Sequence, residues 1–245
     1  MVIGVTDSGI GGLWLLSALI KKFPNERYIY YSDNRFAPYG NRNGDFLADR
    51  FYSVTDELKK AGANLAVVGC NTMGVTLGLT AAVKAPIPVA WIYPEAYPEK
   101  EDTLIMTTPL SARSDYVGAL RSRGAEILCD GALAAMAEEA GGCSEEIEKR
   151  LKGMAALNKK RTAVALGCTH YLYFRKAVTD LCGAVKIYDG VRGAVRRAAR
   201  YITDTEPYSL EWRFSGADES EKYIKVYSET VKIAVNAAEN RAYRR

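Results

Sequence analysis

Residues 66–72 read Ala-Val-Val-Gly-Cys-Asn-Thr, an apolar run that ends in a glycine, a cysteine and two hydrogen-bonding side chains. Residues 163–170 repeat this pattern as Ala-Val-Ala-Leu-Gly-Cys-Thr-His. A short apolar run bounded by turn residues is typical of a buried strand, and ligands of open α/β sheets bind beyond the carboxyl ends of the strands. The repeat therefore predicts two strands that each place a thiol, Cys70 or Cys168, at a binding edge.

The alternation of apolar runs and amphipathic segments continues on both sides of these stretches. We expect strands at residues 2–5, 28–31, 65–69, 103–106, 126–129, 162–166 and 185–188, and a final strand near Trp212. We expect helices at residues 13–23, 45–61, 114–123 and 191–202. Further helices are expected to begin at about Gly74, to pass through Met136 and Leu151, and to begin at Glu219. This order is typical of an α/β fold with mainly parallel sheets covered by helices.

Two boundaries can be predicted from local composition. The helix at residues 45–61 has Asn43 as a candidate N-cap, and Gly62 lies where a helix end needs a positive φ. Its apolar residues recur at helical spacing, at Leu47, Phe51, Val54 and Leu58. Residues 85–101 are rich in proline, which is typical of a crossing between domains, and we place a boundary near Trp91.

The composition limits the classes of function. The chain of 245 residues carries a net charge of +4 with its basic residues scattered among 29 acidic ones, so a nucleic-acid partner is not required. The N-terminus lacks the features of a signal peptide, and no apolar run approaches the roughly 20 residues of a membrane span. We expect a cytoplasmic protein. Its five cysteines are an odd number, which favours free thiols over a disulfide framework.

The two Gly-Cys strand ends suit a reaction that inverts a stereocentre. A thiol with a pKa near ~8.5 exchanges a proton readily near neutral pH, particularly when a cation or a helix N-terminus lowers that pKa. Inversion without a cofactor needs a base on one face of a carbon and an acid on the other. We therefore expect Cys70 and Cys168 to form an opposed acid/base pair, with no cofactor.

Burial in the core is the alternative interpretation for any cysteine, and we accept it for Cys129, Cys143 and Cys182. A metal site built from Cys70, Cys168 and His170 is a further alternative. We expect no metal, because Cys-x-His is too short for the usual zinc spacings. His170 is the only histidine in the sequence, and its place beside Cys168 favours a role in proton transfer over packing.

Two loops at the same predicted sheet edge are candidates for binding. Residues 7–12 read Asp-Ser-Gly-Ile-Gly-Gly and lack the spacing of a dinucleotide or P-loop motif. They form a close turn that presents Asp7 and Ser8, with backbone N–H groups able to receive a carboxylate. Residues 38–40, Pro-Tyr-Gly, are either a simple turn or a binding loop that uses Tyr39 and Gly40.

Together these blocks resemble the glutamate racemase family of the aspartate/glutamate racemase superfamily. The resemblance covers nearly the whole chain, in residues 7–13, 38–40, 69–72, 167–171, 188–190 and the tail at 214–216. It implies two pseudo-symmetric α/β domains with the substrate in the cleft between them. We assign residues 1–91 and about 190–245 to the domain of Cys70, and residues 92–189 to the domain of Cys168.

The resemblance also implies roles for individual residues. Cys70 and Cys168 would each remove the proton from one enantiomer of glutamate, with Asp7 assisting the first thiol and His170 the second. The substrate's carboxylates and amine would be held by Asp7, Ser8, Tyr39, Gly40, Asn71, Thr72, Thr169 and His170. Glu138, Thr107 and Ser111 are further candidates, although a solvated helix end explains Glu138 equally well. The product, D-glutamate, would supply peptidoglycan synthesis.

Some alternatives stay open. The histidine after Cys168-Thr169 favours glutamate, but Met73, Leu172 and Trp14 depart from the residues usual in the family, so another amino acid such as aspartate is a second candidate. A third is a catalytically weak paralogue that binds an amino acid. The expected partner is a small amino acid, with no nucleic acid and no membrane, and homodimerisation is left open.

Overall fold

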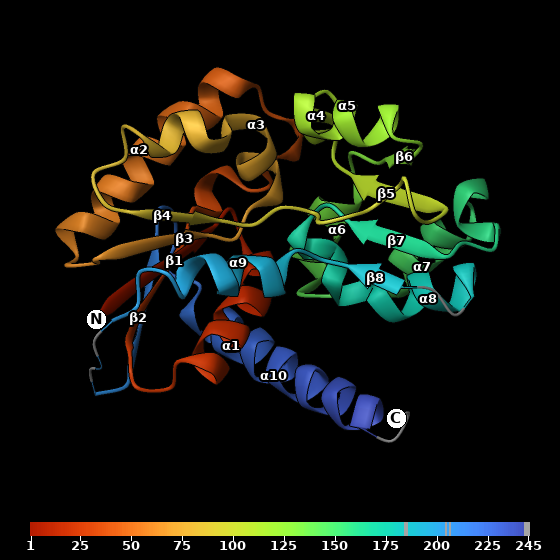
Figure 1. Ribbon diagram of the computed structural model, residues 1–245. Coiled ribbons are helices and arrows are strands. Elements are labelled where there is room, and N and C mark those ends of the chain that lie inside the picture. The colour runs from red at the N-terminus through yellow and green to blue at the C-terminus, as the bar shows by residue number, and fades with distance from the viewer. Residues whose placement is uncertain (184–185, 204, 206, 243–245) are drawn as a thin grey trace.

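The structure, a computed structural model, describes residues 1–183, 186–203, 205 and 207–242. Within these residues the strands form two sheets in which every strand pair is parallel, one of five strands and one of four (Figure 1). The first has the order β4-β3-β1-β2-β9, with bounds Val89–Trp91, Leu65–Val68, Val2–Asp7, Arg27–Ser32 and Ser209–Phe214. The second has the order β6-β5-β7-β8, with bounds Glu126–Cys129, Thr103–Thr107, Ala163–Leu166 and Lys186–Tyr188. The predicted α/β class is confirmed.

Helices cover both faces of the first sheet. Their bounds are Leu13–Lys22 (α1), Gly44–Lys60 (α2), Asn71–Ala82 (α3), Val191–Ala198 (α9) and Ser220–Ala242 (α10). In β2, Tyr28 and Tyr30 belong to the core beneath α1, α9 and α10, whereas Ile29 and Tyr31 belong to the core beneath α2 and α3. Successive strand residues point to opposite faces, so a strand buried on both faces is apolar throughout.

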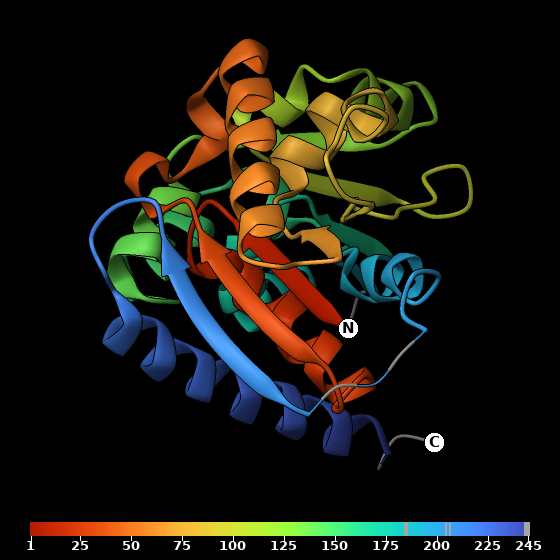
Figure 2. The same ribbon diagram turned by 90° about the vertical axis from the view of Figure 1, so that its left-hand side faces the viewer.

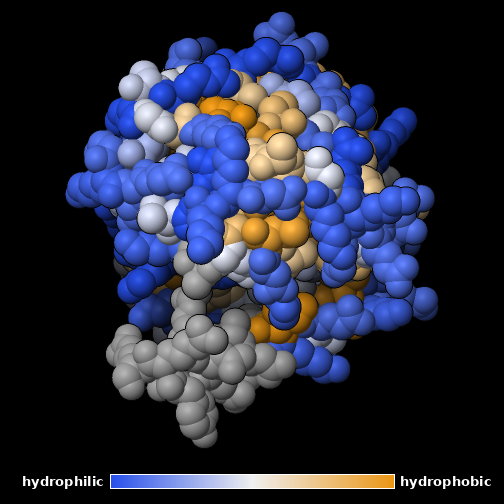
Figure 3. Space-filling view, turned by 90° about the vertical axis from the view of Figure 1, so that its right-hand side faces the viewer, coloured by the Kyte–Doolittle hydropathy of each residue, from blue (hydrophilic) through white to orange (hydrophobic). Residues whose placement is uncertain are grey.

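The remaining helices surround the second sheet or connect it to the first. Their bounds are Pro109–Ala112 (α4), Asp115–Ser122 (α5), Leu133–Ala140 (α6), Glu145–Lys152 (α7) and Arg175–Cys182 (α8). Short 3-10 turns lie at Ile10–Gly12 (η1), Asn34–Phe36 (η2), Tyr39–Asn41 (η3), Ala155–Asn158 (η4) and Thr169–Phe174 (η5). The end of the molecule that carries these helices is mostly hydrophilic, with small apolar patches (Figure 3).

The second half of the chain returns to the first sheet. β9 lies beside β2, and α10 runs along the same side of the molecule (Figure 2). The strands of the first sheet thus come from residues 2–91 and 209–214, and those of the second from residues 103–188. The domain boundaries that we assigned stay a prediction. None of the helices that the structure describes combines the length and apolar character needed to cross a bilayer.

Several local predictions are confirmed and others are wrong. The side chain of Asn43 accepts a hydrogen bond from the Phe46 N–H at 2.8 Å, and Gly62 has a φ of +90°. The edge strand β4 within the proline-rich segment was not predicted; Val89–Trp91 itself contains no proline, and Pro88 and Pro94 lie on either side of it. Helix α3 begins at Asn71 instead of near Gly74, and α8 was not predicted.

The predicted strand at residues 185–188 is present from Lys186 as β8, whereas Val185 lies outside the described residues.

Replacing Asn43 by alanine is expected to lower the free energy of unfolding by about 1 kcal/mol, because the Phe46 N–H loses its side-chain partner. Urea unfolding followed by circular dichroism measures the change. Asn43→Asp serves as the control, since aspartate is an equally good N-cap and should retain the stability. Equal losses in both variants would contradict the capping role.

Candidate active site

The carboxyl ends of the two sheets meet where β1, β3 and β7 end. The Gly69 N–H donates to the Thr6 carbonyl at 2.7 Å, and the Gly167 N–H donates to the Met106 carbonyl at 2.8 Å. Each glycine thus continues its strand by one residue, and Cys70 or Cys168 follows. Across the gap, the Thr169 hydroxyl donates to Asp7 Oδ2 at 2.8 Å. The two halves therefore bring both thiols to facing edges, as the repeat predicts.

Cys70 lies at the N-cap of α3 and is buried. Burial raises the pKa of its thiol well above the usual range, and the charge of Asp7 raises it further. Hydrogen bonds from the Met73 and Thr72 N–H groups act in the opposite direction, since the N-terminus of α3 favours a negative sulfur. The balance leaves Cys70 protonated at neutral pH.

Cys168 begins a chain of contacts that leads through His170 to Glu138. The Cys168 sulfur lies 3.7 Å from His170 Nδ1, and His170 Nε2 lies 2.7 Å from Glu138 Oε2. Burial disfavours the charged imidazole, but its contacts with Cys168 and Glu138 outweigh this and raise the pKa of His170 well above its usual range. The structure thus pairs this thiol with a protonated imidazole.

Glu138 is itself held in the ionised state. Burial opposes its charge, but the contact with His170 and a hydrogen bond of 2.8 Å from the Ile10 N–H lower its pKa below the usual range. Its side chain is 14% exposed. The carboxylate therefore lies behind His170 and not at a solvated helix end.

The glycine-rich turn after β1 makes this approach possible. A Cβ atom at Gly9 would overlap the Glu138 carboxylate, and one at Gly11 would lie 2.5 Å from Thr169 Oγ1. Side chains of the second half therefore occupy the space that these glycines leave free. The close packing expected of the turn is observed, and it serves contact between the two halves.

Asp7 and Ser8 end the first strand of the first sheet. Asp7 Oδ1 accepts from the Ser8 N–H at 2.6 Å, while Oδ2 accepts from Thr169. Burial raises the pKa of Asp7, and the nearby charge of His170 and the Thr169 hydrogen bond counteract this. Residues of both halves therefore contact Asp7 and influence its pKa.

Three hydroxyl groups form a cluster across the two halves. Thr72 Oγ1 lies 3.0 Å from Thr108 Oγ1, which lies 3.0 Å from Ser111 Oγ, and Ser111 lies 3.2 Å from Thr72. Thr72 and Ser111 were sequence candidates, but Thr108 was not, although it stands between Thr107 and Pro109 in the same loop. The candidates on either side of it, Thr107 and Ser111, were the signal that could have identified Thr108.

Asn71 and Thr107 have buried polar atoms without a partner in the part of the chain that the structure describes. These are Oδ1 and Nδ2 of Asn71 and Oγ1 of Thr107. An unpaired buried polar atom is costly, so such groups are typical of positions that meet a polar ligand. Thr107 is the last residue of β5, and Asn71 begins α3 shortly after the end of β3, at the edge where the thiols lie.

Tyr39 and Gly40 also lie at this edge. The Tyr39 hydroxyl donates to Asp33, whose carboxylate receives Arg50 through two hydrogen bonds of 2.8 Å. A Cβ atom at Gly40 would lie 2.7 Å from Thr108 Cβ. Asp33 and Arg50 were not predicted as part of the site, since only the position of Asp33 at the end of β2 pointed to it.

The other cysteines have separate surroundings. All five cysteines are free thiols, as the composition indicates. The expectation that Cys129 and Cys143 are core residues is wrong, because both are exposed: Cys129 ends the edge strand β6, and Cys143 lies in the loop after α6. Cys182 is buried as expected. Among residues 1–183, 186–203, 205 and 207–242, no group of three or more His, Cys, Asp or Glu residues is placed to hold a metal ion.

Comparisons with known proteins bear on this geometry. The sequence model of the Asp/Glu/Hydantoin racemase family matches residues 15–198. A glutamate racemase of Clostridium kluyveri is 32% identical over 215 residues, which cover 82% of this chain and 83% of the relative. A glutamate racemase of Clostridium perfringens is 28% identical over 253 residues, with 94% and 96% covered.

Solved structures share the fold. Glutamate racemase of Francisella tularensis, in complex with D-glutamate, matches with a TM-score of 0.76 and 21% identity, covering 94% of this chain and 93% of that one. Escherichia coli glutamate racemase, in complex with L-glutamate and an activator, matches with a TM-score of 0.76 and 22% identity, covering 94% of each chain. The match of the family model over most of the chain, together with the relative at 32% identity, shows that this chain belongs to the Asp/Glu/Hydantoin racemase family and is a racemase.

Proposed function

We propose that this racemase interconverts L- and D-glutamate without a cofactor, by proton transfer at Cys70 and Cys168. The observation that carries the proposal is the pair of buried thiols at facing sheet edges, each following a glycine that extends its strand. Curated relatives of about 30% identity are glutamate racemases, and this supports glutamate as the substrate.

The two thiols would act on opposite faces of the α-carbon. In one direction Cys168 takes the α-proton while the Cys70 thiol gives a proton to the other face, and in the reverse direction the roles exchange. The high pKa of Cys70 suits the donor role, and Cys168 lies 3.7 Å from Nδ1 of His170, whose pKa is raised well above its usual range. Asp7 would assist the exchange at Cys70, and His170 with Glu138 the exchange at Cys168.

The polar residues at the same edge would hold the substrate. We assign the carboxylates and the amine of glutamate to Asp7, Ser8, Tyr39, Gly40, Asn71, Thr72, Thr107, Ser111, Thr169 and His170. The unpaired atoms of Asn71 and Thr107 support this, because a bound carboxylate or ammonium group would satisfy them. The closed hydroxyl cluster of Thr72, Thr108 and Ser111 supports a fixed subsite.

The product would serve cell-wall synthesis, since D-glutamate is a component of peptidoglycan. We place the reaction in the cytoplasm. The five free thiols support this location, because disulfides are rare in the reducing cytosol. The alternatives are aspartate as the substrate and a binding role with weak catalysis. Racemization rates with glutamate and with aspartate separate them.

The purified protein is expected to racemize each enantiomer of glutamate without pyridoxal phosphate and after dialysis against a chelator, as followed by circular dichroism. Cys70→Ala and Cys168→Ala are each expected to lower the rate by at least about 10²-fold, because each removes one acid/base group. The exposed Cys143→Ala is the control and should retain full activity. A faster rate with aspartate than with glutamate would identify aspartate as the preferred substrate. Full activity in either thiol variant would exclude the two-thiol mechanism.

Substrate α-deuterium isotope effects are expected to separate the supports of the two thiols. His170→Asn should slow transfer at Cys168, so the isotope effect grows in the direction that Cys168 begins and shrinks in the other. Asp7→Asn should do the reverse. Enantiomers have equal free energies, so kcat/KM stays equal for both, and the asymmetry appears in the isotope effects and in separate kcat and KM values. Isotope effects that are equal in the two directions, in both variants, would show that these residues only shape the pocket.

Gly9→Ala is expected to lower the racemization rate about tenfold or more, because the new Cβ displaces the Glu138 carboxylate from His170. The fold should persist, since the overlapping group is the end of a flexible side chain. Gly118→Ala in α5 is the matched control, because nothing lies within 4 Å of its added Cβ. Unchanged activity in Gly9→Ala would remove Glu138 from the mechanism.

A further inference from the structure

The first turn of α10 contacts the Glu138 oxygen that does not meet His170. Lys222 Nζ lies 3.6 Å from Glu138 Oε1, and the Tyr223 hydroxyl lies 3.4 Å from the same oxygen. The other oxygen, Oε2, meets His170 and the Ile10 N–H. Each oxygen of one carboxylate therefore has its own set of partners, and the set on Oε1 comes from the C-terminal helix.

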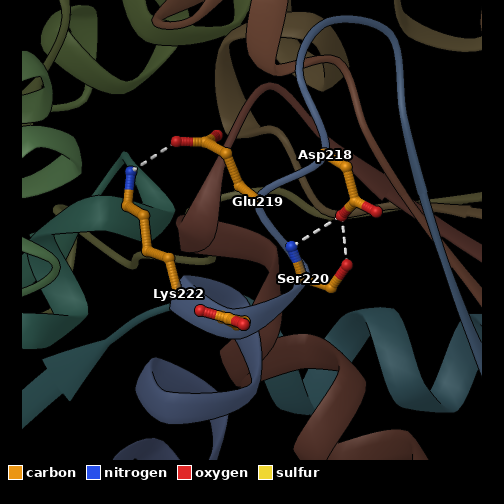
Figure 4. Close-up of a pocket in the computed structure, with 5 residues that line it drawn as sticks. Asp218, Glu219, Ser220 and Lys222 are labelled. Carbon is orange, nitrogen blue, oxygen red and sulfur yellow. Dashed lines mark hydrogen bonds and ion pairs between the residues drawn. The ribbon is translucent and has the colours of Figure 1, made fainter.

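The position of this helical turn is fixed by several contacts. Figure 4 shows Lys222 directed toward Glu219, at 3.3 Å, and Asp218 accepting a hydrogen bond from the Ser220 N–H at 2.8 Å. Glu219 in turn accepts from Asn34 Nδ2 at 2.8 Å. The start of α10 is thereby attached to the segment that follows β2.

Tyr223 anchors the same turn in the core. Its side chain is completely buried, and its hydroxyl lies 2.6 Å from Ser32 Oγ. The ring packs against Tyr30 and Phe214, with centroids 6.0 Å and 5.0 Å away. Burial and the charge of Glu138 raise the pKa of Tyr223, so the phenol stays neutral. Lys222 is the neighbour of Tyr223 in the sequence, so the contacts of Tyr223 also fix the position of the Lys222 backbone.

Lys222 is the cation on the outer side of Glu138. Its side chain is 34% exposed and lies in a pocket of about 480 Å³ at the start of α10, so solvent weakens its field. The charge of Lys222 lowers the pKa of Glu138, in addition to the larger contribution from His170. The titratable groups that face or influence Glu138 are Asp7, Tyr30, His170, Tyr173, Lys222 and Tyr223.

We propose that Lys222 is a positioning residue for proton transfer at Cys168: its ammonium group holds Oε1 of the Glu138 carboxylate, whose Oε2 meets His170. Tyr223 and Ser32 fix the turn that carries it. This inference rests on the proposed function. It makes α10, which packs on the sheet of Cys70, a support for the opposite thiol.

Lys222→Met tests the role of the charge, since it keeps much of the side chain and removes the cation. Without Lys222, protonation of Glu138 becomes easier, so the acid limb of the pH profile of kcat/KM is expected to move to higher pH by about half a unit. The isotope effects should change in the same sense as in His170→Asn, but less. Lys222→Arg should restore both properties, and Lys225→Met, the same charge change at an exposed site of α10, should leave them unaltered.

A second measurement does not need activity. His170 is the only histidine in the sequence, so its imidazole resonances can be followed by NMR without ambiguity. Titration of Glu138 should appear as an inflection of these resonances at acidic pH. In Lys222→Met this inflection is expected about half a pH unit higher than in the wild type or in Lys225→Met.

The outcomes separate this inference from the proposed function. If the wild type racemizes glutamate and Lys222→Met matches Lys225→Met in pH profile, isotope effects and NMR inflection, Lys222 has no positioning role. An inactive wild-type protein would contradict the proposed function itself. In that case an unshifted inflection would overturn the contact between Lys222 and Glu138, and a shifted one would support it independently of catalysis.

Discussion

The hydrogen bond from Thr169 to Asp7 joins the two sheets at the point where both thiols emerge, and the rest of the site depends on it. It forms because the turn after β1 consists largely of glycine, which lets Thr169 and Glu138 approach the backbone of the first half. A Cβ atom at Gly9 would displace the Glu138 carboxylate, and one at Gly11 would crowd the side chains of Thr169 and His170. The absence of side chains at these glycines of the turn thus allows residues of the two sheets to come together in one site.

The two thiols occupy similar positions but have different surroundings. Cys70 meets backbone N–H groups and an anion, so its burial is only partly offset and its thiol is held protonated. Cys168 meets an imidazole that Glu138 keeps charged. The proposed exchange between the thiols needs one proton donor and one proton acceptor at any moment, and it would use two residues of the same type in these different surroundings.

The sequence predicted most strands and the thiol edge, because strand ends, glycines and N-caps leave local signals, as at Asn43 and Gly62. It failed where tertiary context decides. β4 was missed because it has only three residues and lies among prolines that are typical of a loop. The partners of Glu138 were out of reach, since Lys222 lies on a helix with ordinary amphipathic spacing and meets Glu138 only after β9 returns to the first sheet.

Stability and binding are in tension at Asn71. Its amide oxygen and nitrogen are both buried without a partner in the described part of the chain, and each such group costs about 1–3 kcal/mol. An apolar residue of similar size would remove that cost from the folded state. The cost is tolerable if a ligand with both a carboxylate and an ammonium group occupies the site, because the same atoms then gain partners on binding. The unpaired amide therefore favours a polar ligand with donor and acceptor groups over an apolar one.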